Sequence, residues 1–280
     1  MKIGIIGAGK VGITLGKYLT DAGISVTGYY SKTKESADIA ATFTKTTSYQ
    51  TLEDLAQRCD TLFITTPDGV IGQVWQQLQT LNITGYIICH FSGSLSSNIF
   101  TGIGRTGAYG GSIHPMYAFC DKFSSYQQFH TAVLTMEGDP VFLEKMHALW
   151  SGLGHKVLSL KAEDKVRYHA AAALASNYML GLMQTSLDLL STCGFSEEDS
   201  MMLLSPLVEG NIAAMLDKGC VEALTGPVER NDIQTVQKHL KALKGTDTEK
   251  IYKNLGGKMV SLAKRRNPDR DYSTLQKAFE

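Results

Sequence analysis

Met1-Lys-Ile-Gly-Ile-Ile-Gly-Ala-Gly-Lys-Val-Gly-Ile-Thr-Leu-Gly16 is the stretch that decides the fold of this chain. The apolar run Ile3–Ile6 predicts a short buried strand, and Leu15 and Leu19 mark the apolar face of a helix that follows. Between the strand and the helix lies Gly7–Gly12, which has the spacing G-x-G-x-x-G. Glycines at these positions permit a tight turn, a close approach of the backbone to a pyrophosphate, and close packing of helix on strand.

This spacing predicts a dinucleotide site at the start of the first helix. A helix N-terminus offers unpaired N–H groups and a positive dipole end to phosphates. The alternative is a glycine-rich turn without a ligand, but here a strand precedes the motif and a helix follows it. The residues predicted to contact the cofactor in this turn are Gly7, Ala8, Gly9, Lys10, Val11 and Gly12.

The end of the second predicted strand, over residues 24–30, indicates which dinucleotide binds. The NAD-binding version of this arrangement has an acidic residue about 20 positions after the glycines, which holds the ribose 2′-hydroxyl. This chain has Ser31, Lys32 and Thr33 there, and no carboxylate precedes Glu35. Two hydroxyls and a cation suit a 2′-phosphate, so the predicted cofactor is NADP(H). A solvated turn with an incidental lysine is the alternative.

Further β-rich runs follow, and loops at two strand ends are predicted to reach the cofactor. Strands are predicted over residues 62–66, 86–90, 108–114, 131–136 and 155–158, with a helix over 140–150. Thr66 and Pro67 end one strand, and the next residue, Asp68, fits a helix N-cap. Ser92 and Gly93 follow another strand, where ligands bind in open α/β sheets. An N-cap box for the next helix is the alternative for the serine. The strand that carries His114 is expected to stop at the following proline.

Composition excludes several classes of protein. The 27 Lys and Arg side chains balance 27 Asp and Glu, so no nucleic-acid partner is expected. No apolar run approaches the roughly 20 residues that a membrane helix needs. The chain starts directly with a strand, so no signal peptide is expected, and five scattered cysteines without a C-x-x-C pair indicate a reduced, cytoplasmic protein. No metal is expected, because no H-E-x-x-H motif or cysteine–histidine cluster occurs.

The second half of the chain has a different pattern. A continuous helix is predicted from Ala162 to Cys193, and further helices over residues 197–214, 232–243 and 248–262. The fold class is therefore α/β, with a doubly wound, mostly parallel sheet in residues 1–160 and an all-helical domain in residues 161–280. Apolar residues such as Met201, Met202 and Leu216 exceed what a small helical domain can bury. A homodimer formed through this domain is expected.

Six motifs in order carry a resemblance to a known family. They are Gly7-Ala-Gly-Lys-Val-Gly12, His90-Phe-Ser-Gly-Ser94, His114-Pro115, Tyr168-His169, Ser176-Asn177 and Leu224-Thr-Gly-Pro227. Together they resemble predicted oxidoreductases that join a Rossmann-like NADP-binding domain to a C-terminal domain of unknown function. More distantly, the chain is similar to pyrroline-5-carboxylate reductase, deazaflavin-dependent NADP reductase and the β-hydroxyacid dehydrogenases. The resemblance implies hydride transfer to or from a small carbonyl, imine or alcohol substrate.

One position departs from these relatives. β-Hydroxyacid dehydrogenases have a catalytic lysine on the long helix, followed three and four residues later by asparagines. Aligning Ser176 and Asn177 with that pair puts Ala173 at the lysine position. Two alternatives to an enzyme therefore stay open: a non-catalytic dinucleotide sensor, and a structural dimer with a vestigial site.

The candidates for proton transfer lie on the predicted long helix. Lys165, His169 and Ser176 share one helix face, and Asn177 lies at its edge. Histidine has an unperturbed pKa near neutrality, so His169 is the predicted proton donor and Asn177 the residue that orients the substrate. His114 is predicted to oppose them from the end of its strand. A solvent-facing polar strip is the alternative.

A turn between two predicted helices provides a candidate anion site. Thr225, Gly226 and Arg230 lie in this turn, and arginine binds carboxylate or phosphate well. The expected substrate is therefore small and anionic. A structural connector with a surface arginine is an equally good interpretation.

Overall fold

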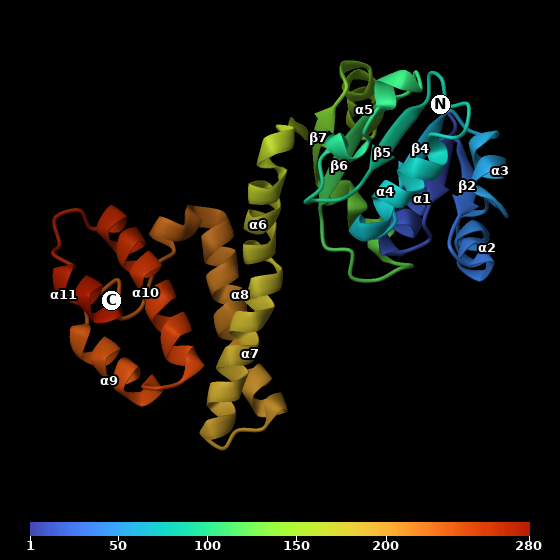
Figure 1. Cartoon of the computed structure of the whole chain (residues 1–280). Coiled ribbons are helices and arrows are strands. Elements are labelled where there is room, and N and C mark those ends of the chain that lie inside the picture. Colours follow the sequence, from blue (N-terminus) through green and yellow to red (C-terminus); the bar gives the residue numbers. More distant parts are fainter. The chain divides into compact units, whose positions relative to one another are not determined.

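The computed structural model describes residues 1–280 and divides them into two compact units, Met1–Ser176 and Asn177–Glu280. The division follows Ser176, later than the boundary predicted at residue 160, so the helix over 165–175 belongs with the sheet. Figure 1 shows the sheet and the helices packed on it in blue to green, the helix over 165–175 in yellow, and the helices of the second unit in darker yellow to red.

The first unit contains one eight-stranded sheet (Figure 1). Its strands are β1 Ile3–Ile6, β2 Val26–Tyr30, β3 Thr47–Ser48, β4 Thr61–Ile64, β5 Ile87–His90, β6 Tyr109–Met116, β7 Val133–Gly138 and β8 Val157–Ser159. They lie in the order β3-β2-β1-β4-β5-β6-β7-β8, and all neighbouring pairs are parallel except β6 and β7. The prediction of a doubly wound, mostly parallel sheet is confirmed.

Helices cover the sheet and form a hydrophobic core on each face. They are α1 Lys10–Asp21, α2 Lys34–Thr44, α3 Leu52–Ala56, α4 Asp68–Leu78 and α5 Pro140–Gly152. Helix α6, Lys165–Ala175, belongs to the same unit but contributes no residue to either core. Successive side chains of a strand point to opposite faces. Ile5 and Phe63 therefore enter one core, whereas Ile6 and Ile64 enter the other. Because both faces are buried, β1 has no polar side chain and β4 has only Thr61, rather than an alternation of polar and apolar residues.

The turn between β1 and α1 depends on two glycines. Gly7 has a φ of 109°, a conformation that other residues rarely adopt. A Cβ atom on Gly12 would collide with the carbonyl oxygen of Gly7 and would lie 2.6 Å from Oγ1 of Thr65. Gly12 therefore allows α1 to pack closely on the strands, as the motif predicts.

Strand β6 does not stop before its proline, as the sequence suggested. It continues through Pro115 to Met116. β5 ends at His90, which pairs with Ser112, so beyond this point β6 has β7 as its only neighbour. Proline lacks an N–H donor and is tolerated where one side of a strand is unpaired.

The predicted continuous helix over residues 162–193 is also interrupted. Ser176 has φ −124° and ψ −79°, which is not helical, and it separates α6 from α7, Asn177–Thr192. The helical-wheel argument that placed Ser176 and Asn177 on the face of Lys165 therefore does not hold. Local propensity does not reveal this break, because alanine-rich sequence precedes it and no glycine or proline marks it.

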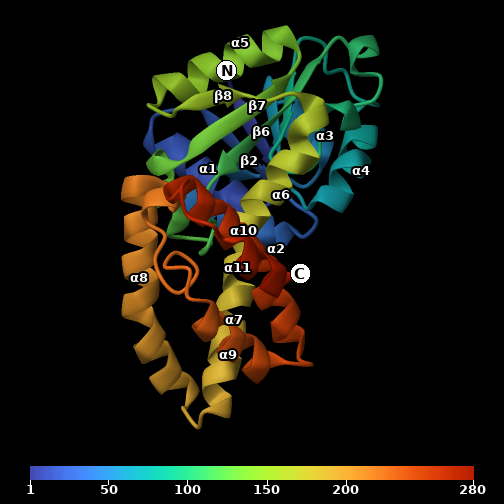
Figure 2. The same cartoon turned by 90° about the vertical axis from the view of Figure 1, so that its left-hand side faces the viewer.

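The second unit is all-helical, as predicted. After α7 it contains α8 Glu197–Glu222, α9 Ile233–Leu243, α10 Asp247–Arg266 and α11 Ser273–Phe279, the last of which was not predicted (Figures 1 and 2). Helices α9, α10 and α11 pack around a small core that includes Val236, Val260 and Leu275. Helix α8 contains Pro206 and is kinked at Gly219, whose φ is 79°.

Candidate functional site

A cleft of about 700 Å³ runs along the carboxyl ends of β1, β2 and β4. Seven of the predicted cofactor residues line it, namely Gly7, Ala8, Gly9, Ser31, Lys32, Thr66 and Pro67. These residues come from three separate loops. The parallel sheet brings the loops together, because the carboxyl ends of parallel strands lie at one edge.

The cleft is suited to phosphate where it meets α1. Gly9 occupies the N-cap position without a side-chain cap, and no acidic residue lies in the first turn. A Cβ atom on Gly9 would meet nothing within 4 Å, so the space beside it is open. The first N–H groups of the helix are thus available to an anion. Lys10 and Val11 belong to this turn but do not line the cleft, and Nζ of Lys10 donates to the carbonyl of Cys120 at 2.8 Å.

The residues after β2 have separate roles. Ser31 and Lys32 line the cleft, and Lys32 has no hydrogen bond or ion pair with the protein. Thr33 does not line the cleft and instead caps α2, where its Oγ1 accepts from the backbone N–H of Ser36. Ser36 lines the cleft and was not predicted. Its position in the first turn of α2 was the available signal.

The loop after β4 offers an unpaired polar atom to a ligand. Oγ1 of Thr66 is buried and has no hydrogen-bond partner in the protein. Oγ1 of the preceding Thr65 donates to the carbonyl of Gly7 at 2.9 Å and so ties this loop to the glycine turn. Buried polar groups are usually paired, so the free hydroxyl of Thr66 is a fitting contact for a bound cofactor.

Asp68 is not an N-cap, contrary to the sequence-based interpretation. Pro67 occupies the cap position, and Asp68 is the first residue of α4. Its Oδ2 accepts from the hydroxyls of Ser92 at 2.8 Å and Ser94 at 2.9 Å. The carboxylate therefore holds the loop after β5, a contact that is set by the neighbouring positions of β4 and β5 in the sheet.

A buried lysine also holds the loop after β5 by a hydrogen bond. Lys165 is 2% exposed, and its Nζ donates to the carbonyl of Ser92 at 2.7 Å and to the hydroxyl of Ser112. Burial lowers the pKa of Lys165 to about 8, and the negative charges of Glu137 and Asp68 oppose this shift. Oγ of Ser92 itself accepts from the backbone N–H of Leu95, so this serine also caps its own turn. Lys165 supports the loop rather than facing solvent with His169.

His114 lies at the end of β6 and is hydrogen-bonded to Tyr168 of α6. The distance from its Nδ1 to the tyrosine oxygen is 2.9 Å, and the two rings are nearly perpendicular, at 89°. Burial lowers the pKa of His114 to about 4, and the positive charges of Lys165 and His169 add to this effect. The imidazole is therefore neutral at pH 7.

His169 lies beside His114, over the glycine of the β5 loop. The two ring centroids are 5.9 Å apart. A Cβ atom on Gly93 would lie 2.5 Å from Nδ1 of His169 and 2.8 Å from Nε2 of His114. Both imidazoles thus lie against Gly93 at the carboxyl end of β5, and neither of these two nitrogens is hydrogen-bonded to the protein. Glycine is needed here because any side chain would displace one of the rings.

Two of the predicted site residues do not belong to this cluster in the first unit. Ser176 is exposed at the break between α6 and α7, and Asn177 is the exposed first residue of the second unit. Their contribution to the site stays a prediction. Tyr168, in contrast, was not predicted as a site residue, although its place beside His169 in a quoted motif was a signal.

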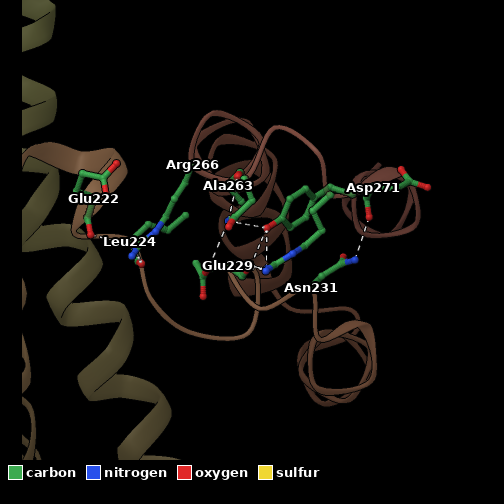
Figure 3. A network of polar contacts seen from close by, with 10 residues as sticks. Glu222, Leu224, Glu229, Asn231, Ala263, Arg266 and Asp271 are labelled. Carbon is green, nitrogen blue, oxygen red and sulfur yellow. Dashed lines mark hydrogen bonds and ion pairs between the residues drawn. The ribbon is translucent and has the colours of Figure 1, made fainter.

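Hydrogen bonds from the last residue of α10 and from the loop after it hold the turn over residues 224–230 in place (Figure 3). Nη1 of Arg266 donates to the carbonyls of Glu222, at 2.8 Å, and Leu224. Nη1 of Arg270 and the hydroxyl of Tyr272 both donate to the carbonyl of Glu229, at 2.7 Å each. This network supports the interpretation of the turn as a structural connector.

Thr225 and Arg230 are exposed and form no side-chain hydrogen bond with the protein, and their binding of an anion stays a prediction. No group of three or more His, Cys, Asp and Glu side chains is placed to hold a metal ion. None of the helices combines the length and apolar character that crossing a membrane requires.

Comparison with known proteins identifies both parts of the chain. Residues 1–115 match the Rossmann-like domain, and residues 132–259 match a domain of unknown function, DUF2520. No curated protein matches the sequence.

Solved structures share the whole architecture. Protein TM1727 from Thermotoga maritima has a TM-score of 0.76 at 24% identity, over 94% of this chain and 98% of its own. A candidate NADP oxidoreductase from Bacteroides fragilis, BF3122, has a TM-score of 0.72 at 21% identity, over 93% of this chain and 98% of its own. Plasmodium falciparum pyrroline carboxylate reductase with NADP bound has a TM-score of 0.60 at 12% identity, over 100% of this chain and 98% of its own. The chain therefore joins a Rossmann-like domain to a DUF2520 domain, the combination that its motifs predicted.

Proposed function

We propose that this protein is an NADP(H)-dependent oxidoreductase that transfers a hydride to or from a small carbonyl, imine or alcohol substrate. The observation that carries the proposal is that a cleft and a pair of histidines lie next to each other along one edge of the sheet. The glycine-lined cleft lies at the ends of β1, β2 and β4, and the pair His114 and His169 lies over the end of β5. A binding cleft and a group of titratable side chains thus follow each other along neighbouring strands.

The residues of the cleft suit the cofactor. The free N–H groups at the start of α1 would hold the pyrophosphate. Ser31 and Lys32 would bind the 2′-phosphate, and the hydroxyl of Thr66 would bind a further polar group of the cofactor. A bound nicotinamide dinucleotide would supply the hydride. The pyrroline carboxylate reductase of similar fold has NADP bound, which supports this assignment.

The side chains beyond the cleft would handle the proton. Hydride adds to the carbon of a carbonyl or imine and leaves negative charge on the oxygen or nitrogen, which a positioned acid must neutralise. We assign that acid to His169, which is exposed beside Gly93, and assign Asn177 to orienting the substrate. His114 is neutral and so contributes a hydrogen bond rather than a proton. In the second unit, the exposed side chains of Thr225 and Arg230 are the candidates for binding an anion.

Turnover tests this proposal. NADPH is incubated with a panel of small ketoacids and cyclic imines, and its loss is followed by absorbance at the nicotinamide band. Gly9→Val should abolish consumption and binding, because its side chain enters the open space beside the phosphate site. The matched variant Gly152→Val, at the end of α5 with nothing within 4 Å, should retain both. Binding of NADPH without consumption of any panel member would contradict an oxidoreductase of this substrate class.

A non-catalytic dinucleotide sensor is the second candidate. Ala173 favours it, because the similar β-hydroxyacid dehydrogenases have their catalytic lysine at the aligned position. A sensor would bind NADPH and change its association with a partner without consuming the cofactor. The panel experiment therefore separates the two candidates, since fold alone does not.

Cofactor choice is a separate expectation. NADPH should bind more tightly than NADH, because Lys32 lines the cleft without a protein partner and no carboxylate is present at this position. Lys32→Asp should weaken NADPH binding by about 1.5–3 kcal/mol, the value of one charge-assisted hydrogen bond. Calorimetry measures both affinities, and Lys145→Asp, the same charge change on exposed α5, is the control. Equal affinities of the unmodified protein for the two cofactors would refute the NADP assignment.

Assembly is expected to involve the second unit. Large apolar side chains of α7 and α8 are exposed, among them Leu180 at 69%, Leu207 at 61% and Leu216 at 77%. A homodimer would remove such a surface from water. Sedimentation should show a particle of twice the 30.5 kDa chain mass, and Leu207→Glu with Leu216→Glu should shift it toward monomer. A stable monomer of the unmodified protein at micromolar concentration would contradict the dimer.

The place of action that we propose is the cytoplasm. All five cysteines are free thiols, and Cys120, Cys193 and Cys220 are exposed. A reducing compartment keeps exposed thiols in this state.

A further inference from the structure

Three side chains from three elements form a continuous hydrogen-bonded chain behind the candidate site. Thr135 of β7 lies opposite His114 of β6 in the antiparallel pair. Oγ1 of Thr135 is 3.1 Å from the hydroxyl of Tyr168 in α6, and that hydroxyl is 2.9 Å from Nδ1 of His114. The chain ends at the imidazole whose other nitrogen, Nε2, lies against Gly93.

The hydrogens of this chain can be assigned from its donors and acceptors. Oγ1 of Thr135 is 3.1 Å from the oxygen of Tyr168 and 3.4 Å from the carbonyl oxygen of His114, so we assign its hydrogen to the shorter contact, with Tyr168. Tyr168 has one hydrogen, and the only other polar atom bonded to its hydroxyl is Nδ1 of His114. Donation from Tyr168 to Nδ1 satisfies both groups, so we assign the tyrosine hydrogen to this contact and Nδ1 as the unprotonated acceptor. A neutral imidazole has one N–H group, so the hydrogen of His114 is on Nε2.

We propose that Tyr168 is a positioning residue that fixes His114 in the Nε2–H tautomer, so that a single hydrogen-bond donor faces the site beside Gly93 and His169. Its catalytic consequence rests on the proposed oxidoreductase function. In that reaction Nε2–H would donate to the oxygen or nitrogen bonded to the carbon that accepts the hydride, while the neighbouring His169 supplies the proton to that oxygen or nitrogen. The site would thereby select substrates that present a hydrogen-bond acceptor, a carbonyl oxygen or an imine nitrogen.

The charges around His114 support a fixed neutral tautomer. His114 faces three side chains of α6, namely Lys165, His169 and Tyr168. The charges of Lys165 and His169 lower the pKa of His114, and the carboxylate of Asp68 in α4 raises it. Burial and the charge of Lys165 outweigh this carboxylate, so that the pKa of His114 falls to about 4. Burial also raises the pKa of the Tyr168 phenol, which keeps its hydrogen available to donate. At neutral pH the tautomer of His114 therefore decides whether its Nε2 is a hydrogen-bond donor or an acceptor.

The tautomer can be observed without a substrate. Long-range ¹H–¹⁵N spectra of the full chain with ¹⁵N-labelled histidine distinguish Nδ1–H from Nε2–H imidazoles. At pH 7, His114 should show Nε2–H alone, and Tyr168→Phe should convert it into a mixture of tautomers while leaving the ring packing in place. Thr135→Val, which removes the donor behind Tyr168, should shift the spectrum in the same direction but less.

The protein contains a matched control pair in its second unit. Nδ1 of His239 is 2.8 Å from the hydroxyl of Tyr252, in the same kind of contact. Tyr252→Phe should change the signals of His239 and leave those of His114 unchanged. An Nδ1–H signal for His114 in the unmodified protein, or a spectrum that Tyr168→Phe does not change, would overturn the proposal.

Kinetics give the second readout once a substrate is found. Tyr168→Phe should lower kcat by about 10- to 100-fold, the usual effect of losing a residue that orients an imidazole, with the Kd for NADPH unchanged. Tyr252→Phe should leave kcat unchanged. An unchanged kcat in Tyr168→Phe would contradict the positioning role. If no panel substrate is turned over, the proposed function fails, and the spectra still decide the tautomer independently.

Discussion

His169→Ala is expected to lower turnover about 10²- to 10⁴-fold, the usual contribution of a positioned general acid, while NADPH affinity stays unchanged. The imidazole lies beside Gly93 and His114, whereas the residues of the cofactor cleft come from other loops. Removing it should leave the oxygen or nitrogen of the substrate without a proton donor and the cleft intact. Steady-state kinetics and calorimetry measure the two effects separately.

A matched control comes from the same unit. His147 is exposed on α5, and its Nδ1 contacts the hydroxyl of Ser151 at 3.3 Å. His147→Ala should leave turnover unchanged. Equal turnover of His169→Ala and His147→Ala would exclude His169 as the acid. A loss of NADPH affinity in His169→Ala would instead assign the residue to cofactor binding.

Lys165→Met is expected to change how stability depends on pH. Lys165 is buried, and its pKa falls from 10.5 to about 8 in the folded protein. Below pH 8 both the folded and the unfolded chain have this lysine protonated, so the cost of burying the charge is fully present. Between pH 8 and 10.5 only the unfolded chain retains the proton, and stability therefore rises with pH. The methionine variant lacks this rise.

The difference can be measured by denaturant unfolding of both proteins at several pH values. The free energy of unfolding of the unmodified protein, relative to Lys165→Met, should increase by about 3 kcal/mol between pH 8 and 10.5. Groups common to both proteins cancel in this comparison. Lys145→Met, at an exposed position of α5, should show no such change. A constant difference across the range would mean that Lys165 keeps an ordinary pKa.

Local pattern was sufficient for the backbone of the first unit. The strand Ile3–Ile6, the glycine turn after it and helix α1 were all predicted, because each depends on residues that are adjacent in sequence. Local pattern also misled at three places. It ended β6 before Pro115, made Asp68 a cap, and joined α6 and α7 across Ser176. The length of β6 and the contacts of Asp68 depend on the strands that lie beside β6 and β4 in the sheet. A short stretch of sequence does not show which strands these are.

The sequence alone therefore determined that a strand, a glycine turn and a helix open a mostly parallel sheet with a cleft at its edge, and that helices follow. Only the tertiary structure decided how the polar side chains beside that cleft are arranged. Tyr168 reaches His114 across 54 residues of sequence, and Lys165 reaches Ser92 across 73. The physical reason is that hydrogen bonds and the fit of two imidazoles against Gly93 depend on strand order and register, which place distant residues within 3 Å of each other.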